Sequence, residues 1–327
     1  MRLRFSWLSV VLTIVAIGVT TQASADRTPI ARIGEVWIQT AAGATPYHQG
    51  WVDGLRDLGY IEGQNMVLFT RYADGDISRL PTLFDELVRL RVDVLIVSAR
   101  AIRAAQKATN TIPIVCATMN DPVSEGVVAS LARPGGNITG VSWQAPDTAT
   151  KRLELALELK PKLTRLAVLF DSDDKVAQLE VEIVTTAAKK AKVTVEAFDV
   201  HERGDITAAF TSMAKSGPQM IYLVQTAVTT GLRSQIAVLA TELRVPVISA
   251  ERSVAEAGAV LTYGPKLRSV LKRGAAYVDR ILKGARPQEL PIEQPTEFEL
   301  VINLKAADAV GIKVPASTLS RADYVIR

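Results

Sequence analysis

The chain has 327 residues, of which 48% are hydrophobic and 22% are charged, and its formal net charge is +4. This length suffices for two medium-sized domains, and the composition is that of a globular protein rather than a disordered one. Arg2 and Arg4 lie in a segment that we expect to be removed, which leaves 36 basic and 34 acidic residues. That balance argues against nucleic acid or an anionic membrane surface as a partner.

Residues 1–25 have the features of a secretory signal. Arg2 and Arg4 precede an apolar run over 5–20, and small residues follow at 23–25, so we expect cleavage before Asp26 and a periplasmic protein. The run is too short to span a membrane, no second run of spanning length follows, and no cysteine near the cleavage site offers a lipid anchor. Cys116 is the single cysteine, so no internal disulfide is expected and a buried thiol is favoured.

From residue 31 onward, short apolar runs rich in β-branched residues alternate with amphipathic stretches, which is typical of parallel sheets with crossover helices. The first unit has five predicted strands in one sheet, with helices between them and Gly59 as a helix terminator. The strands are expected at 32–38, 65–71, 92–97, 112–116 and 137–141, and the helices at 46–58, 78–89, 102–108 and, as a short one, 124–131.

A second unit repeats the alternation. Its strands are predicted at 165–170, 194–198, 220–224, 247–249 and 259–263, and its helices at 148–159, 176–191, 206–215, 232–243 and 254–257. A long helix at 267–282, a strand at 297–302 and a short helix at 306–310 remain. If these return to the two units, the chain crosses between them three times. We therefore predict an α/β protein of two Rossmann-like lobes with parallel sheets, joined by a hinge of three crossings.

The domain boundaries follow from this order. Lobe 1 is expected to comprise 26–142 with about 266–289, and lobe 2 to comprise 143–265 with about 290–303. Residues 304–327 form a C-terminal tail that packs on the lobes.

Residues just after the strands are the candidates for a binding site, because ligands of open parallel sheets bind outside the carboxyl ends of the strands. These positions are rich in amide, hydroxyl and aromatic groups, with few carboxylates, which suits a small polar or amphipathic ligand. The candidates are Gln39, Thr40, Ser98, Ala99, Thr118, Asn120, Asp121, Trp143, Asp171, Gln225, Thr226, Ser249 and Tyr263, and Ser172 and Glu251 stand at similar positions.

Signals of catalysis, metal binding and cofactor binding are weak. His48 and His201 are the only histidines; they fall in different lobes without a cysteine or second histidine at ligand spacing, so no metal site is expected. Residues 134–137 are glycine-rich but lead into a strand, and neither GxGxxG nor GxSxG occurs, so no cofactor is expected. The acidic residues Asp173 and Asp174 are better explained as helix caps than as cation ligands.

Four stretches resemble the ABC-transporter substrate-binding family that includes the tryptophan-binding TrpX-like proteins. They are residues 54–65 (GLRDLGYIEGQN), the pair 121–122 (DP) with 131–140 (LARPGGNITG), 151–155 (KRLEL), and 302–307 (INLKAA) with Gly311, Pro315 and 321–323 (RAD). The likeness runs in register from about residue 33 to the end. It implies a type I periplasmic-binding fold that closes on a ligand.

The resemblance leaves the ligand open. Some relatives look like binders of aromatic amino acids, and an amino acid needs an acid for its ammonium group and donors for its carboxylate. Asp121 is one candidate acid, and Arg100 is the arginine nearest to a predicted strand end. We therefore predict a monomeric, non-enzymatic solute-binding protein of an ABC importer, whose partners are a small molecule and a permease. The alternatives are a periplasmic sensor for a receptor kinase and, less favoured, an enzyme on the same scaffold.

Overall fold

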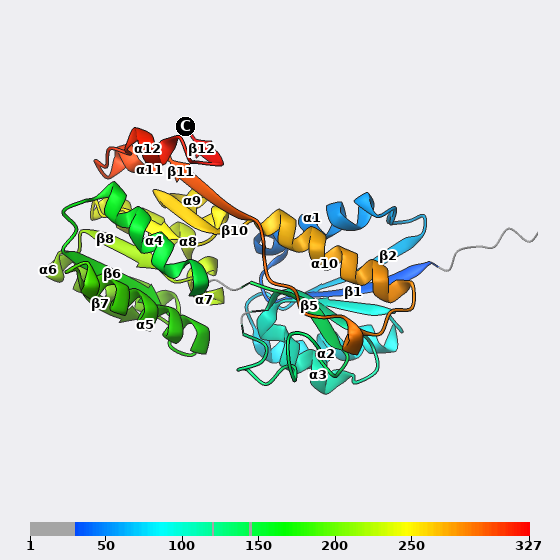
Figure 1. The fold of residues 1–327 in the computed structure, drawn as a ribbon. Helices are drawn as coiled ribbons and strands as arrows, with labels where there is room; N and C mark the ends of the chain where they lie inside the picture. The colour runs from blue at the N-terminus through cyan, green and yellow to red at the C-terminus, as the bar shows by residue number, and fades with distance from the viewer. Residues whose placement is uncertain (1–29, 120, 144–145) are drawn as a thin grey trace, which may run out of the picture.

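The computed structural model describes residues 30–119, 121–143 and 146–327, so the expected signal segment lies outside the described residues. It consists of two α/β lobes that lie side by side (Figure 1). The sheet of lobe 1 has five parallel strands in the order β2-β1-β3-β4-β5. They are β1 (Ala31–Trp37), β2 (Met66–Tyr72), β3 (Val94–Val97), β4 (Ile114–Met119) and β5 (Ile138–Ser142). The predicted five-stranded parallel sheet is confirmed.

Lobe 1 contains α1 (Ala41–Asp57), α2 (Leu80–Arg89) and α3 (Ile102–Ala108), with short 3-10 turns η1 (Ile77–Arg79) and η2 (Ala99–Ala101). Helix α1 begins five residues earlier than predicted, because the Thr40 side chain caps it by accepting from the Gly43 backbone N–H. The helix predicted at 124–131 is wrong. Gly126 has a φ of +62°, and Val127 and Val128 both donate to the Pro122 carbonyl, so the chain forms successive turns instead.

Lobe 2 is built on a seven-stranded sheet in the order β12-β11-β10-β9-β8-β6-β7. Only the β10–β11 pair is antiparallel. The strands are β6 (Arg165–Phe170), β7 (Thr194–Asp199), β8 (Met220–Leu223), β9 (Val247–Ser249), β10 (Leu261–Pro265), β11 (Phe298–Asn303) and β12 (Tyr324–Ile326). The helices are α4 (Pro146–Leu159), α5 (Lys175–Lys190), α6 (Arg203–Ser216), α7 (Ala227–Gly231), α8 (Arg233–Glu242) and α9 (Arg252–Ala257).

Helix α10 (Leu267–Leu282) leaves the lobe 2 sheet and lies along α1 in lobe 1 (Figure 1). The two helices approach closely because glycine replaces larger residues where they meet. Gly274 of α10 faces Trp51 of α1 and Ala117 of β4, and Gly50 of α1 faces Leu271 of α10. The apolar face of α10 thereby belongs to the same core cluster as β1 and α1.

After a short turn, η3 (Pro287–Glu289), the chain returns to lobe 2. Leu290 and Ile292 still pack in lobe 1, and Glu293 bridges Val141 of β5, so this crossing lies a few residues beyond the expected boundary near 290. The tail forms α11 (Leu304–Ala309), α12 (Ala316–Leu319) and β12. Its apolar residues pack on the core of lobe 2, where β12 adds an edge strand that the sequence pattern did not predict.

In the part of the chain that the structure describes, no helix has the length and apolar character needed to cross a bilayer.

Candidate functional site

A cleft between the lobes brings together residues from the ends of parallel strands and from the first turns of the helices that follow them. It encloses about 900 Å³, counting space open to solvent. Its walls are Trp37, Ile38, Gln39, Tyr47, Ser98, Ala99, Arg100, Thr118 and Trp143 from lobe 1 and Asp174, Val176, Ala177, Glu180, Gln225, Thr226, Ala227 and Thr230 from lobe 2.

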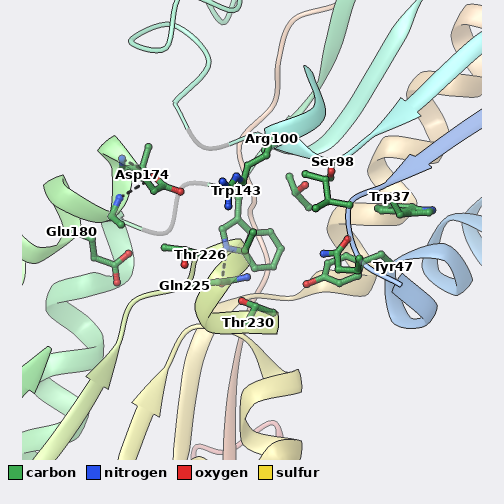
Figure 2. A pocket seen from close by; sticks show the side chains of 17 residues that line it. Trp37, Tyr47, Ser98, Arg100, Trp143, Asp174, Glu180, Gln225, Thr226 and Thr230 are labelled. Atoms are coloured by element: carbon green, nitrogen blue, oxygen red, sulfur yellow. Dashed lines mark hydrogen bonds between the residues drawn. The ribbon is translucent and has the colours of Figure 1, made fainter. Parts of the chain in front are cut away.

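Aromatic side chains form much of the lobe 1 wall. Trp37 ends β1 and Tyr47 lies on α1, with their ring centroids 6.0 Å apart. Trp143 follows β5 and is almost fully buried; Figure 2 shows its indole ring near the centre of the cleft. Aromatic rings around a few polar groups are well suited to a ligand that has a flat apolar part.

Hydrogen bonds cross the cleft directly. Trp143 Nε1 donates to Gln225 Oε1 at 3.2 Å, and the Gln225 amide donates in turn to Glu251. On the other side, the Tyr47 hydroxyl lies 3.0 and 2.9 Å from the two carboxylate oxygens of Glu251, and Ser253 donates to the same group at 2.5 Å. The side chains of Trp143, Gln225, Glu251 and Tyr47 thus link lobe 1 to lobe 2 through one buried carboxyl group.

The electrostatics of Glu251 follow from its burial. Only 1% of the residue is exposed, and this burial raises the pKa of the Glu251 carboxyl, although hydrogen bonds from Ser253 and Tyr47 and the charge of Arg233 oppose the change. Burial, with the negative charge of Glu251, also raises the Tyr47 pKa well above its usual range. Tyr47 is therefore a neutral hydrogen-bond donor at every physiological pH.

Charged groups of opposite sign line the cleft near Trp143. Arg100 comes from η2 in lobe 1, and Asp174 precedes α5 in lobe 2 (Figure 2). Asp174 Oδ1 caps α5 by accepting from Val176 N–H at 2.9 Å and Ala177 N–H at 3.2 Å. Burial raises the pKa of Asp174, against the effect of these backbone donors and of the Arg100 charge.

Four polar atoms of the cleft wall are buried without a hydrogen-bond partner among the residues that the structure describes. They are Trp37 Nε1, Gln39 Oε1, Ser98 Oγ and Thr230 Oγ1. A buried polar group that lacks a partner costs about 1–3 kcal/mol. Their concentration in one cleft indicates that a bound molecule or water completes their hydrogen bonds.

A buried ionic network lies behind the lobe 2 wall. The Arg152 guanidinium is fully buried and contacts Glu180, the Tyr222 hydroxyl at 2.6 Å, Thr148 Oγ1 at 2.5 Å and the Tyr263 carbonyl at 3.2 Å. Tyr222 also donates to Glu180 at 2.7 Å. The negative charge of Glu180 is therefore paired with Arg152 inside lobe 2, although Glu180 also lines the cleft.

Most of the strand-end candidates do meet in the cleft. Gln39, Ser98, Ala99, Thr118, Trp143, Gln225 and Thr226 line it. Thr40 lines an adjoining hollow that shares Gln39, Tyr47 and Thr230 and continues past Asp74 and His201. Asn120 lies outside the described residues.

Four candidates lie elsewhere, and each has a structural partner. The Asp121 carboxylate accepts from the backbone and side chain of Ser124, so it caps a turn rather than facing the cleft. Asp171 Oδ1 accepts from the Asp173 backbone and lies beside His201, whereas the Ser249 hydroxyl donates to the Leu223 carbonyl. The Tyr263 ring stacks on Phe298, with 6.2 Å between centroids.

Several lining residues were missed because they lie inside helices rather than at strand ends. Tyr47 and Glu180 sit on α1 and α5, and Thr230 is on α7, a short helix that was not predicted. The capping signal of Asp174 was identified, but its exposure to the cleft was not. Extending the search from each strand end through the first turns of the next helix would have found these residues.

His201 is surrounded by carboxylates, which the sequence search for a cysteine or second histidine at ligand spacing did not reveal. Its Nδ1 lies 3.1 Å from Asp171 Oδ1 and 3.5 Å from Asp173 Oδ2, and its Nε2 lies 3.1 Å from Asp199 Oδ2. Asp171, Asp173 and His201 are the one group of three in the described chain with donor atoms close enough for a metal ion. The nearby carboxylates raise the His201 pKa against the effect of desolvation, so an imidazolium also satisfies the cluster. The histidine-spacing search missed it because the partners are aspartates.

Comparisons with known proteins agree with this architecture. The family model for ABC transporter substrate binding proteins matches residues 40–326. A curated relative, the tyrosine-binding protein of Clostridioides difficile (strain R20291), is 25% identical over 264 residues, which are 80% of this chain and 76% of that protein. A domain from Streptococcus pneumoniae, solved in complex with L-Trp, superposes with a TM-score of 0.83 at 26% identity, covering 90% of this chain and 99% of that one. A conserved domain protein from Vibrio cholerae has the same TM-score and coverage at 28% identity.

Proposed function

Because the chain belongs to the ABC transporter substrate-binding protein family, we propose that it is the periplasmic solute-binding component of an importer and that it captures an amino acid with an aromatic side chain. Substrate-binding proteins of this kind act outside the cytoplasm, and the expected signal segment at 1–25 supports export of this one. The mature chain hands its ligand to a permease and breaks no bond.

The observation that carries the ligand class is the composition of the cleft. Trp37, Tyr47 and Trp143 supply aromatic surface, and the buried atoms Gln39 Oε1 and Ser98 Oγ need hydrogen-bond partners. The names of two relatives support the same class, since one binds tyrosine and another was solved with L-Trp.

The mechanism is closure of the two lobes on the ligand. A ligand that contacts both lobes stabilises the closed form, because those contacts exist only when the cleft is shut. The linked hydrogen bonds that run from Trp143 through Glu251 to Tyr47 join the two lobes directly. These contacts also favour the closed form. The permease then distinguishes the loaded, closed protein from the open one.

The test is a thermal-unfolding screen of the protein lacking residues 1–25, after unfolding and refolding to strip any bound ligand. L-tryptophan and L-tyrosine are compared with glucose, adenosine and L-glutamate. A true ligand at about 100 times its dissociation constant stabilises by about 2.7 kcal/mol, which raises the melting temperature by several degrees at roughly 2–4 °C per kcal/mol. A shift with the sugar or nucleoside alone would refute the amino-acid class, and calorimetric titration would then define the new ligand.

A further inference from the structure

We propose that Arg100 and Asp174 recognise the two charges of a zwitterionic ligand, with Arg100 binding its carboxylate from lobe 1 and Asp174 binding its ammonium group from lobe 2. The inference rests on the proposed function and assigns residues that relatives' names do not identify.

Arg100 is the cation of the cleft wall. Among the described residues that line the cleft, it is the one cationic side chain, and it has no ion pair in the part of the chain that the structure describes. Figure 2 shows it reaching over Trp143 from the lobe 1 side. Ser98, two residues earlier on the same wall, has a buried hydroxyl to which no described residue donates or from which none accepts a hydrogen bond. A guanidinium with an adjacent hydroxyl matches a carboxylate, which accepts two or more charge-assisted hydrogen bonds.

Among the described acids of the cleft wall, Asp174 is the one with a carboxylate oxygen that can still accept hydrogen bonds. Its Oδ1 caps α5, whereas no protein donor reaches Oδ2 within the described chain. The other two carboxyl groups at the cleft are engaged, Glu180 by Arg152 and Tyr222, and Glu251 by Tyr47, Gln225 and Ser253. Burial disfavours the charged form of Asp174. A ligand ammonium group beside this carboxylate would offset the cost of burying its charge.

A second acid adds to the negative potential from the opposite lobe. Glu125, in the turns after β4, is half-buried and close enough to Asp174 for their charges to interact. When the lobes close, these like charges are opposed, and a cation between the lobes relieves the repulsion. The positive end of the ligand therefore favours closure, as its negative end does at Arg100.

This placement predicts discrimination by charge. A ligand with only a carboxylate leaves Asp174 desolvated and unpaired, and a ligand with only an amine leaves Arg100 unpaired. Because hydrogen bonds to charged groups are stronger than neutral ones, each missing charge should weaken binding about 10- to 100-fold.

The experiment measures dissociation constants of L-tryptophan, indole-3-propionate and tryptamine by calorimetry. The variants are Arg100→Gln and Asp174→Asn, and asparagine still caps α5 because it is as good an N-cap as aspartate. Lys107→Gln on α3 and Asp173→Asn, whose side chain is 81% exposed, remove the same charges outside the cleft and serve as controls.

Arg100→Gln should abolish the preference for L-tryptophan over tryptamine, which lacks the carboxylate, and keep the preference for L-tryptophan over indole-3-propionate. Asp174→Asn should abolish the preference over indole-3-propionate, which lacks the ammonium group, and keep the preference over tryptamine. The controls should match the parent. If the parent binds L-tryptophan but neither variant changes these ratios, the assignment is overturned and the proposed function stands. If the parent binds none of the three compounds and no aromatic amino acid in the thermal screen, the proposed function fails and the assignment fails with it.

Discussion

The Tyr47 hydroxyl, carried by α1 of lobe 1, hydrogen-bonds to both carboxylate oxygens of Glu251, which precedes α9 of lobe 2. The two residues are 204 positions apart in the sequence, and the carboxyl is inaccessible to solvent. In the closure that we propose, opening the cleft would break this contact and expose the acid to water. On this proposal, the hydrogen bonds between Tyr47 and Glu251 stabilise the closed form relative to the open one.

Replacing Tyr47 by Phe should favour the open form. The change removes a buried hydrogen bond to an acidic group, and such a bond contributes about 1.5–3 kcal/mol. Because we expect this bond only when the lobes are closed, its loss should destabilise the closed form and leave the open form unchanged. The apparent affinity for the ligand should therefore fall by about 10-fold or more. Calorimetric titration gives the affinity, and small-angle scattering gives the radius of gyration with and without ligand.

Tyr60→Phe is the matched control for that change. The Tyr60 hydroxyl donates to Asp279 Oδ1 at 3.0 Å, but both residues lie within lobe 1. This variant should lower the melting temperature without altering ligand affinity or the radius of gyration. Equal losses of affinity in the two variants would mean that Tyr47 acts through the stability of its lobe rather than through closure.

Glu251→Gln should change how stability depends on pH. Because burial raises the pKa of Glu251 above its ordinary value of 4.5, the folded protein holds this proton more tightly than the unfolded chain. The free energy of unfolding then falls as pH rises from about 4.5 through the higher pKa of the folded state. Glutamine does not titrate, so the variant should lack the part of this decrease in the free energy of unfolding that comes from Glu251. Urea unfolding between pH 4 and 8 measures the free energy of unfolding of the parent and the variant. Glu289→Gln changes an exposed surface residue and should show the same pH dependence as the parent.

His48 should stabilise the fold at low pH. Its Nδ1 lies 2.7 Å from Glu35 Oε2, and the hydrogen bond to Glu35 raises the His48 pKa above its ordinary 6.5. This contribution is complete below about pH 6.5 and is lost as pH rises through the pKa of the folded state. The difference in melting temperature between the parent and His48→Gln should therefore shrink between pH 6 and 9. A difference that is constant across this range would show that the ion pair does not contribute.

Gly274→Ala should loosen the attachment of α10 to lobe 1. A methyl group at this position would overlap the Trp51 ring and lie 2.8 Å from Ala117 Cβ, and overpacking of this kind costs about 1–3 kcal/mol. Gly204→Ala, in the exposed first turn of α6 where the nearest atom is 3.6 Å away, should instead raise stability by about 0.4–1 kcal/mol, because alanine reduces the conformational entropy of the unfolded chain. Urea midpoints of both variants test the pair, and a neutral Gly274→Ala would contradict tight packing here.

The sequence pattern was sufficient for the sheets because each buried strand carries a continuous apolar run, as in Val94–Val97 and Met220–Leu223. It failed where a local feature overrode the pattern. The left-handed Gly126 replaced the helix predicted at 124–131 with turns, and the three-residue strand β12 is too short to have a detectable period. Such features depend on single residues and on pairing with distant strands.

The site was only partly predictable for a different reason. Parallel-sheet geometry locates strand ends such as Ser98 and Gln225 from sequence alone, and these line the cleft. Whether a side chain faces the opposite lobe depends on how the lobes meet, which no local pattern encodes. Tyr47 was therefore missed, and Asp121, which was expected at the cleft, instead caps its own turn by accepting from Ser124. The roles of these residues in ligand binding stay predictions.

Helix α10 has consequences for how the protein unfolds. Its apolar face is part of lobe 1, yet its N-terminal end is tied to lobe 2, where Lys266 N–H donates to the Glu297 carbonyl at 3.0 Å and Pro265 pairs with Phe298. Melting lobe 2 would release the N-terminal end of a helix on which lobe 1 depends. We therefore expect the lobes to unfold as one cooperative unit despite their separate sheets, and scanning calorimetry should record a single transition rather than two.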